Sequence, residues 1–283
     1  MYKFGEGKLA FLIAVFNYRS LINFMKIIFL GTNGWFSSKT GLTPCVLIDA
    51  KEGYIVLDAG EGIQKLDKYI KDYEKPIYLF ISHFHLDHIF GLHIFDKLEF
   101  KLRIQIIGKI GTKKMIDVIA NQPFTNKLEN PPFTKKVLSS IDPNSRVIEV
   151  GEGEHTHPVK FKCSLLPHPD PSMGYRFELE NKVITYCTDT GRSEKALRLA
   201  KNADAFISEC AFLPGEPINT TWPHMNPEEA AKEAKDANVK KLILTHFNAD
   251  KYQSAESRKR AERIAKKVFK NTTAAFDDME IEI

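Results

Sequence analysis

The chain has 283 residues and a net charge of +4; 43% of its residues are hydrophobic and 27% are charged. This balance allows a sizeable buried core and excludes a disordered or fibrous protein. The mild positive charge permits a polyanionic substrate without requiring one. The four cysteines form no C-x-x-C pair, so we expect reduced, buried thiols rather than a disulfide framework.

The first 24 residues differ from the rest of the chain. The apolar run from Leu9 to Phe16 resembles the core of a signal peptide, but no small-residue cleavage site follows it. The run is also far shorter than the ~20 residues that a membrane span needs. We therefore predict that residues 1–24 are an extension outside the fold and that residues 25–283 form the folded domain. We also expect a cytoplasmic protein without stable membrane association.

From residue 25 onwards, strands alternate with helices. Apolar and β-branched runs predict strands at 26–30, 43–50, 54–58, 77–82, 103–108, 146–150, 159–166, 174–180, 182–187, 205–208 and 241–245, with two short edge strands at the end. Helices are predicted at 61–72, 88–101, 111–120, 193–201, 225–237 and 255–270. Residues 121–145 hold four prolines and predict a loop or cap insertion. Two β-rich halves, each flanked by helices, predict an α/β fold of the αββα sandwich type.

The strongest chemical signal is the motif His83-x-His85-x-Asp87-His88, which directly follows the apolar run 77–82. Imidazole and carboxylate groups suit zinc and similar divalent ions. On an extended segment His83 and His85 point the same way, while Asp87 and His88 can face a second ion. The motif therefore predicts a metal centre.

Three further candidate ligands stand at the ends of other predicted strands. His168 follows KCSLLP, Asp189 follows ITYCT, and His246 follows KLILT. A single histidine at a strand end is usually only a polar turn residue, but four strand ends with the same character favour a shared site.

At this point the sequence resembles the metallo-β-lactamase superfamily and, within it, ribonuclease Z and related phosphodiesterases. The resemblance runs from Met25 to the C-terminus. It rests on the segments LGTNGW (30–35), LDAGEGIQ (57–64), ISHFHLDHIFGL (81–92), PSMGYRFE (171–178), TDTG (188–191) and LTHF (244–247).

The resemblance implies two ligand sets that share one bridging carboxylate. The first set is His83, His85 and His168, the second is Asp87, His88 and His246, and the bridge is Asp189. Two divalent ions are implied, Zn²⁺ in the first place, with Mn²⁺ or Fe²⁺ as alternatives. Oxygen-reducing diiron relatives carry Glu at the position of His85, which disfavours that branch. His93, His155 and His157 match no motif, and we interpret them as ordinary helix and loop residues.

The resemblance also implies the catalytic groups. Two ions about 3.5–4 Å apart can activate a shared water, and Asp87 would orient it or take its proton. His224 would donate a proton to the leaving alkoxide, with Glu209 as its orienting partner. The backbone of the Gly31–Gly34 turn either receives a phosphate oxygen or is only a tight connection.

The substrate stays open between several classes. Ribonuclease Z proteins commonly carry an arm that grips transfer RNA, inserted between the motifs that here contain Gly174 and Asp189. In this chain two strands and a tight turn at Asn181-Lys182 fill that interval. RNA, or a small phosphodiester such as a cyclic nucleotide, therefore remain as alternatives, with a thioester or lactone and a non-catalytic binding role behind them. We also expect a homodimer.

Basic residues form short runs outside these motifs. The runs are Lys113-Lys114, Lys135-Lys136 and Arg258-Lys259-Arg260. Exposed helices commonly carry such runs as solvated faces, so we do not assign them to RNA binding.

Overall fold

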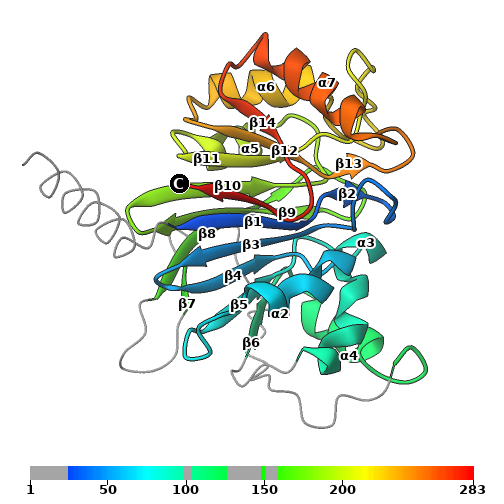
Figure 1. The fold of residues 1–283 in the computed structure, drawn as a ribbon, viewed down its shortest axis with the longest axis vertical. Coiled ribbons are helices and arrows are strands. Elements are labelled where there is room, and N and C mark those ends of the chain that lie inside the picture. Colours follow the sequence, from blue (N-terminus) through cyan, green and yellow to red (C-terminus); the bar gives the residue numbers. More distant parts are fainter. Residues whose placement is uncertain (1–24, 99–103, 126–147, 151–157) are drawn as a thin grey trace, which may run out of the picture.

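Two β-sheets lie face to face, with helices covering both outer faces, in the computed structural model of the protein (Figure 1). The structure describes residues 25–98, 104–125, 148–150 and 158–283. This arrangement confirms the predicted αββα sandwich.

The first sheet has six strands in the order β15-β1-β3-β4-β5-β6. Their bounds are β1 (Lys26–Gly31), β3 (Cys45–Ala50), β4 (Gly53–Leu57), β5 (Ile77–Phe80), β6 (Ile104–Ile107) and β15 (Met279–Glu282). The strands from β15 to β4 pair antiparallel, and β4, β5 and β6 pair parallel. Since Lys26 pairs with Glu282, segments far apart in the sequence form this edge of the sheet.

The second sheet has seven strands in the order β14-β12-β11-β10-β9-β8-β7. Their bounds are β7 (Ile148–Val150), β8 (Val159–Leu166), β9 (Ser172–Leu179), β10 (Lys182–Cys187), β11 (Ala205–Glu209), β12 (Leu242–Thr245) and β14 (Thr272–Ala274). The strands from β10 to β14 are parallel, so their carboxyl ends meet at one edge. The short strands β2 (Asn33–Gly34) and β13 (Phe247–Asn248) pair beside this edge.

Helices cover the outer face of each sheet. The first sheet carries the 3₁₀ helices η1 (Glu61–Lys65) and η2 (Phe90–Lys97) and the helices α2 (Leu66–Tyr69), α3 (Leu86–Ile89) and α4 (Thr112–Ile119). The second sheet carries α5 (Glu194–Ala200), α6 (Pro227–Asp236) and α7 (Ala255–Lys266). Helix α6 begins as predicted, because the side chain of Asn226 accepts a hydrogen bond from the backbone N–H of Glu229.

Side-chain alternation along the strands builds the core. In β3, Val46 and Ile48 face the opposite sheet, whereas Cys45 and Leu47 face the helices. Between the sheets the ring of Phe80 packs edge-on against three aromatic rings of β8 and β9. Each such buried side chain contributes about 1.5–3 kcal/mol relative to an exposed one. This packing fixes the ends of the strands and therefore the starting points of the loops that follow them.

The connection between β9 and β10 is a two-residue turn. Glu180 and Asn181 have φ angles of 48° and 62°, and Leu179 pairs with Lys182. Two successive left-handed residues are typical of the tight hairpin that fits the twist of antiparallel strands. The turn thus lies at Glu180-Asn181, one residue earlier than the predicted Asn181-Lys182, and it leaves no inserted residues between the two strands.

The helix predicted at 88–101 is partly wrong. Helix α3 ends at Ile89, and 3₁₀ turns continue only to Lys97. The backbone here bonds to a neighbouring loop, because Ala59 donates to the carbonyl of His88 and Gly91 donates to that of Ala59.

The predictions for residues 1–24 and for most of 121–145 lie outside the described residues. Within the described ranges, no helix is both long and apolar enough to cross a membrane.

The interpretation of Arg258 as part of a solvated basic run is also wrong. Its side chain is fully buried, although Lys259 and Arg260 are exposed. The guanidinium donates to Thr32 Oγ1 at 2.7 Å and to Asn33, and it lies 4.8 Å from the ring centroid of Phe247. A buried cation needs such partners to offset its lost hydration. Arg258 therefore ties helix α7 to the turn that follows β1.

Candidate metal centre

The loop after β5 carries four of the seven predicted ligands. His83 and His85 lie on its extended part, and Asp87 and His88 lie in the first turn of α3. His83 and His88 are fully buried, while His85 is partly exposed. The close spacing in sequence therefore becomes two adjacent groups of ligands at the edge of the first sheet.

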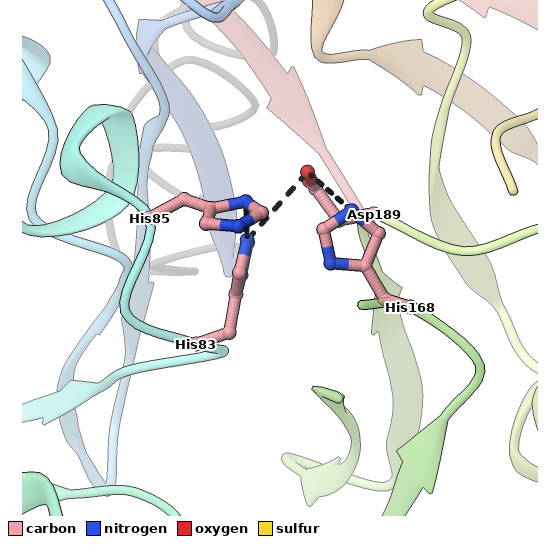
Figure 2. Close-up of side chains that lie close together, drawn as sticks. All are labelled: His83, His85, His168 and Asp189. Carbon is pink, nitrogen blue, oxygen red and sulfur yellow. Dashed lines mark hydrogen bonds and ion pairs between the residues drawn. The ribbon is translucent and has the colours of Figure 1, made fainter. Parts of the chain in front are cut away.

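Three histidines and one carboxylate form the first cluster. His83, His85, His168 and Asp189 each offer one ligand atom, and these atoms lie within 4.8 Å of one another. Figure 2 shows His83 and His85 on one side, facing His168 and Asp189 on the other. Asp189 Oδ2 lies 3.6 Å from His83 Nε2 and 3.7 Å from His168 Nε2. The two sheets therefore contribute to one site.

The second cluster contains Asp87, His88 and His246. Asp189 Oδ1 lies 3.1 Å from the Nε2 atoms of both His88 and His246. Because its other oxygen faces the first cluster, the Asp189 carboxylate lies between the two groups. This is the position that a bridging ligand requires.

The donor set suits a pair of divalent ions. Imidazole nitrogen and carboxylate oxygen are the ligands that zinc and related ions prefer. The Nε2 atom of His168 is buried and has no hydrogen-bond partner among the described residues, although it faces the cluster. A buried polar atom without a partner is costly, and a bound cation would satisfy it. The site thus fits a dinuclear centre.

Backbone conformation fixes two of these ligands. Asp189 has φ of 47° and His246 has φ of 53°, both in the left-handed region that few non-glycine residues adopt. Gly34 packs flat against the His246 ring, where an added Cβ would lie 2.5 Å from its Cε1 atom. Such strain persists only where the surrounding structure imposes it, and it is common at functional sites.

A buried carboxylate outside the clusters orients the histidines. Asp58 Oδ2 lies 2.8 Å from His88 Nδ1 and also accepts hydrogen bonds from Ser82 Oγ and Tyr186 OH. Ser82 Oγ in turn lies 3.0 Å from His83 Nδ1. Contacts of this kind fix the tautomer and ring orientation of metal-binding histidines. Asp58 lies in the LDAGEGIQ segment (57–64), but its orienting role is not apparent from the sequence.

Burial keeps the first cluster in its metal-binding form. It lowers the pKa of His83 well below the ordinary value and also lowers the pKa of His85 and of His168. These imidazoles are therefore neutral at pH 7, the form that can bind a cation.

The second cluster favours a positive charge. Burial opposes protonation of His88, but Asp189, Asp87 and Asp58 outweigh it and raise the pKa of His88 well above the ordinary value. Three carboxylates around one imidazole form a strongly negative environment. A bound metal ion would supply the cation that this environment stabilises.

His224 and Glu209, the expected proton donor and its partner, lie beside the clusters. His224 Nδ1 lies 2.9 Å and 3.0 Å from the two Glu209 carboxylate oxygens, and Glu209 is fully buried. A ligand atom of His224 lies within 4.8 Å of those of Asp189 and His246. Burial lowers the pKa of His224, but Glu209 outweighs it and raises the pKa to about 9. The imidazole is therefore protonated at pH 7 and can act as an acid.

The remaining histidines and the turn after β1 lie outside the two ligand clusters or have no described place. His93 lies in η2 outside both clusters, as expected, while His155 and His157 fall outside the described residues. In the turn after β1, Asn33 N donates to Leu42 O and Trp35 N donates to Asp87 Oδ2. Because these two donors already have protein partners, the structure favours the connecting-turn interpretation over a phosphate cradle.

A cavity of about 670 Å³ opens onto both clusters. Besides the site residues, its lining includes the side chains of Trp35 and Trp222. Neither tryptophan belongs to a metal-ligand pattern, so the sequence alone did not point to them. A cavity of this volume can hold a ligand of moderate size beside the two clusters.

Comparison with known proteins agrees with the geometry. The family model described as "Beta-lactamase superfamily domain" matches residues 46–247, more than half of the chain. Ribonuclease Z of Bacillus velezensis is 28% identical over 308 residues, covering 92% of this chain and 99% of that protein.

Two solved structures show the same fold. The metallo-β-lactamase fold protein YhfI from Bacillus subtilis superposes with a TM-score of 0.72 at 22% identity, covering 91% of this chain and 99% of its own. The short form of human tRNase Z superposes with a TM-score of 0.69 at 23% identity, covering 92% of this chain and 99% of its own. At these identities the likeness establishes the fold and leaves the substrate open.

Proposed function

This chain belongs to the metallo-β-lactamase superfamily as a metal-dependent hydrolase, and we propose that it cleaves phosphodiester bonds with two divalent ions, Zn²⁺ in the first place. Two adjacent ions held by such ligands activate water and neutralise charge on the attacking and leaving oxygens. The ligands would be the two clusters described above, with Asp189 between them.

The pair of His224 and Glu209 carries the proposal. An alkoxide is a poor leaving group whose departure is accelerated strongly by a proton donor, whereas a thiolate leaves readily without one. The Glu209 carboxylate holds His224 Nδ1, so Nε2 remains free to donate a proton to the leaving oxygen. Thioester hydrolysis would not need this acid.

Asp87 supports the attacking side. Its Oδ2 accepts a hydrogen bond from Trp35 N at 2.7 Å and lies 3.4 Å from His246 Nε2. Burial raises the pKa of Asp87, but the positive charge of His88 outweighs it and holds the pKa far below its ordinary value, and a metal ion in place of that charge would likewise keep the carboxylate ionised. An ionised carboxylate in this position orients a water molecule that approaches phosphorus.

Within this reaction class, a small phosphodiester is an alternative to RNA. The two-residue turn between β9 and β10 leaves no arm for gripping the body of transfer RNA. Remote contacts supply binding energy that a large substrate needs for orientation. The name ribonuclease Z carried by relatives at 28% identity supports the RNA alternative.

Dependence on the leaving group tests the proposed acid. The metal-loaded protein would be assayed with p-nitrophenyl, phenyl and methyl diesters, and with a thioester and a lactone. In His224→Gln we expect kcat/KM to fall about 10²–10⁴-fold for the methyl ester and much less for p-nitrophenyl, which needs no acid. His93→Gln is the matched control. Preferred turnover of the thioester or lactone, or an equal loss for every leaving group, would reject the proposal.

A further inference from the structure

The two tryptophans of the chain both lie at the mouth of the metal centre. Trp35 follows β2 and Trp222 precedes α6, and the side chains of both line the cavity. Trp35 is 66% exposed and Trp222 is 46% exposed. Exposed apolar side chains that gather around a cavity are typical of a ligand-binding groove.

Trp222 is held over the first ligand set. Its ring stacks on His85 at a centroid distance of 5.6 Å with an interplanar angle of 8°, and it meets the His168 ring at 5.3 Å and 64°. These contacts fix the orientation of the indole. The part of the indole that remains exposed is therefore presented to the cavity in a defined position.

Trp35 is fixed by its backbone. Its φ of 76° lies in a region that bulky residues rarely adopt, and its N–H donates to Asp87 Oδ2. The ring of Phe36 supports the indole edge-on at 5.2 Å. A strained backbone that presents an exposed indole beside a predicted metal ligand points to a binding role.

Apart from the histidines and the metal ions that they would hold, the described part of the cavity wall offers no basic side chain. None of the described residues that line it is Lys or Arg. Beyond the phosphate group itself, a substrate would therefore be bound through its aromatic and apolar parts. Every nucleobase has a face that stacks on an indole ring, whatever the sequence.

We propose that Trp35 and Trp222 stack on a nucleobase beside the scissile phosphate, so that nucleotide diesters are the preferred substrate class. This inference rests on the proposed function for the bond that is cleaved. The proposed stacking site would favour nucleotide diesters over alkyl diesters. It could bind a base at a single-stranded RNA end as well as the base of a small nucleotide.

A matched pair of substrates tests the inference. Thymidine 5′-(p-nitrophenyl phosphate) and methyl p-nitrophenyl phosphate have the same leaving group and differ in the group that stays on phosphorus. Base stacking predicts that kcat/KM for the thymidine ester exceeds that for the methyl ester by about tenfold to a hundredfold. A ratio near one would overturn the proposal.

Variants then assign the preference to the two indoles. In Trp35→Leu and in Trp222→Leu we expect the ratio to fall about tenfold, while Trp→Phe at either position retains most of it. Phe124→Leu is the control, because Phe124 is 67% exposed and does not line the cavity. An unchanged ratio in both leucine variants would overturn the proposal.

Binding provides a readout independent of turnover. Because these are the only tryptophans in the sequence, indole fluorescence of the metal-loaded protein reports on them directly. Adenosine 5′-monophosphate should quench this emission saturably, and ribose 5-phosphate should not. Quenching without hydrolysis of either diester would reject the proposed function and support the stacking site. Hydrolysis of both diesters at equal efficiency without quenching would reject the stacking site alone.

Discussion

Replacing Glu209 by Gln should move the basic limb of the pH–rate profile. Glu209 raises the pKa of His224 to about 9 against the effect of burial, from an ordinary value of about 6.5. The variant keeps a similar shape and loses the negative charge. In the variant burial is opposed only by Asp189 and Asp87, so we expect the pKa of His224 to fall towards its ordinary value of about 6.5.

The size of the effect follows from these values. Because the pKa of His224 is about 9 rather than about 6.5, the folded protein favours the protonated imidazole by about 3 kcal/mol. At pH 8 about nine-tenths of His224 is protonated in the unaltered protein, and about 3% would be protonated at the ordinary pKa of about 6.5. The rate with a poor leaving group should therefore fall by up to about thirtyfold at pH 8, and the difference should shrink as the pH falls.

The same shift has a consequence for stability. Because the folded-state pKa is raised, the stabilising contribution of His224 is complete below about pH 6.5 and is lost as the pH rises through about 9. The assay is kcat/KM for a methyl diester from pH 5 to 10, with melting temperature and metal content measured alongside. Glu229→Gln is the control, since its carboxylate accepts a hydrogen bond from Lys232 of the same helix and forms no hydrogen bond or ion pair with His224 among the described residues. A basic limb that stays near pH 9 in Glu209→Gln would refute the reasoning.

Four further predictions concern the metal centre, the N-terminal residues 1–24 and the substrate. Elemental analysis should find close to two divalent ions per chain, and Asp189→Ala should lower this number most, because its oxygens face both clusters. Asp58→Asn should weaken metal affinity about 10–100-fold in a metal-buffer titration, because His88 loses its orienting carboxylate. A chain that begins at Met25 should keep diesterase activity and melting temperature; loss of either would show that the extension belongs to the fold. Raising the salt concentration should reduce kcat/KM steeply for a 3′-extended transfer RNA precursor and little for a small diester; efficient, site-specific trimming at moderate salt would contradict this.

Much of the metal centre could be predicted because its signals are local. Apolar runs defined the strands, and ligands at the ends of those strands, such as His168 and His246, had to meet where the carboxyl ends of the strands gather. The motif after β5 supplied four ligands within one short loop. The resemblance to a known family divided them into two sets, which periodicity alone could not do.

The supporting residues could not be predicted in the same way. Asp58 acts through contacts with Ser82 and Tyr186, and the latter lies in the other sheet. Arg258 stands in a basic run on a helix and looks like a solvated residue until its long-range partners are known. The tryptophans belong to turns without a hydrophobic period. Their roles depend on tertiary contacts that sequence patterns do not encode.

The pairing of β1 with β15 has a consequence for the order of folding. Strand β1 gains this neighbour only from residues 279–282, and the Thr32 turn is fixed only when Arg258 and Asp277 are available. During synthesis, an emerging chain can therefore form local turns and hairpins long before this edge of the sheet is closed. Until then β1 has unpaired backbone groups that can recruit other strands. Such contacts between distant segments slow folding, so we expect the nascent chain to depend on chaperones until α7 and β15 have emerged from the ribosome.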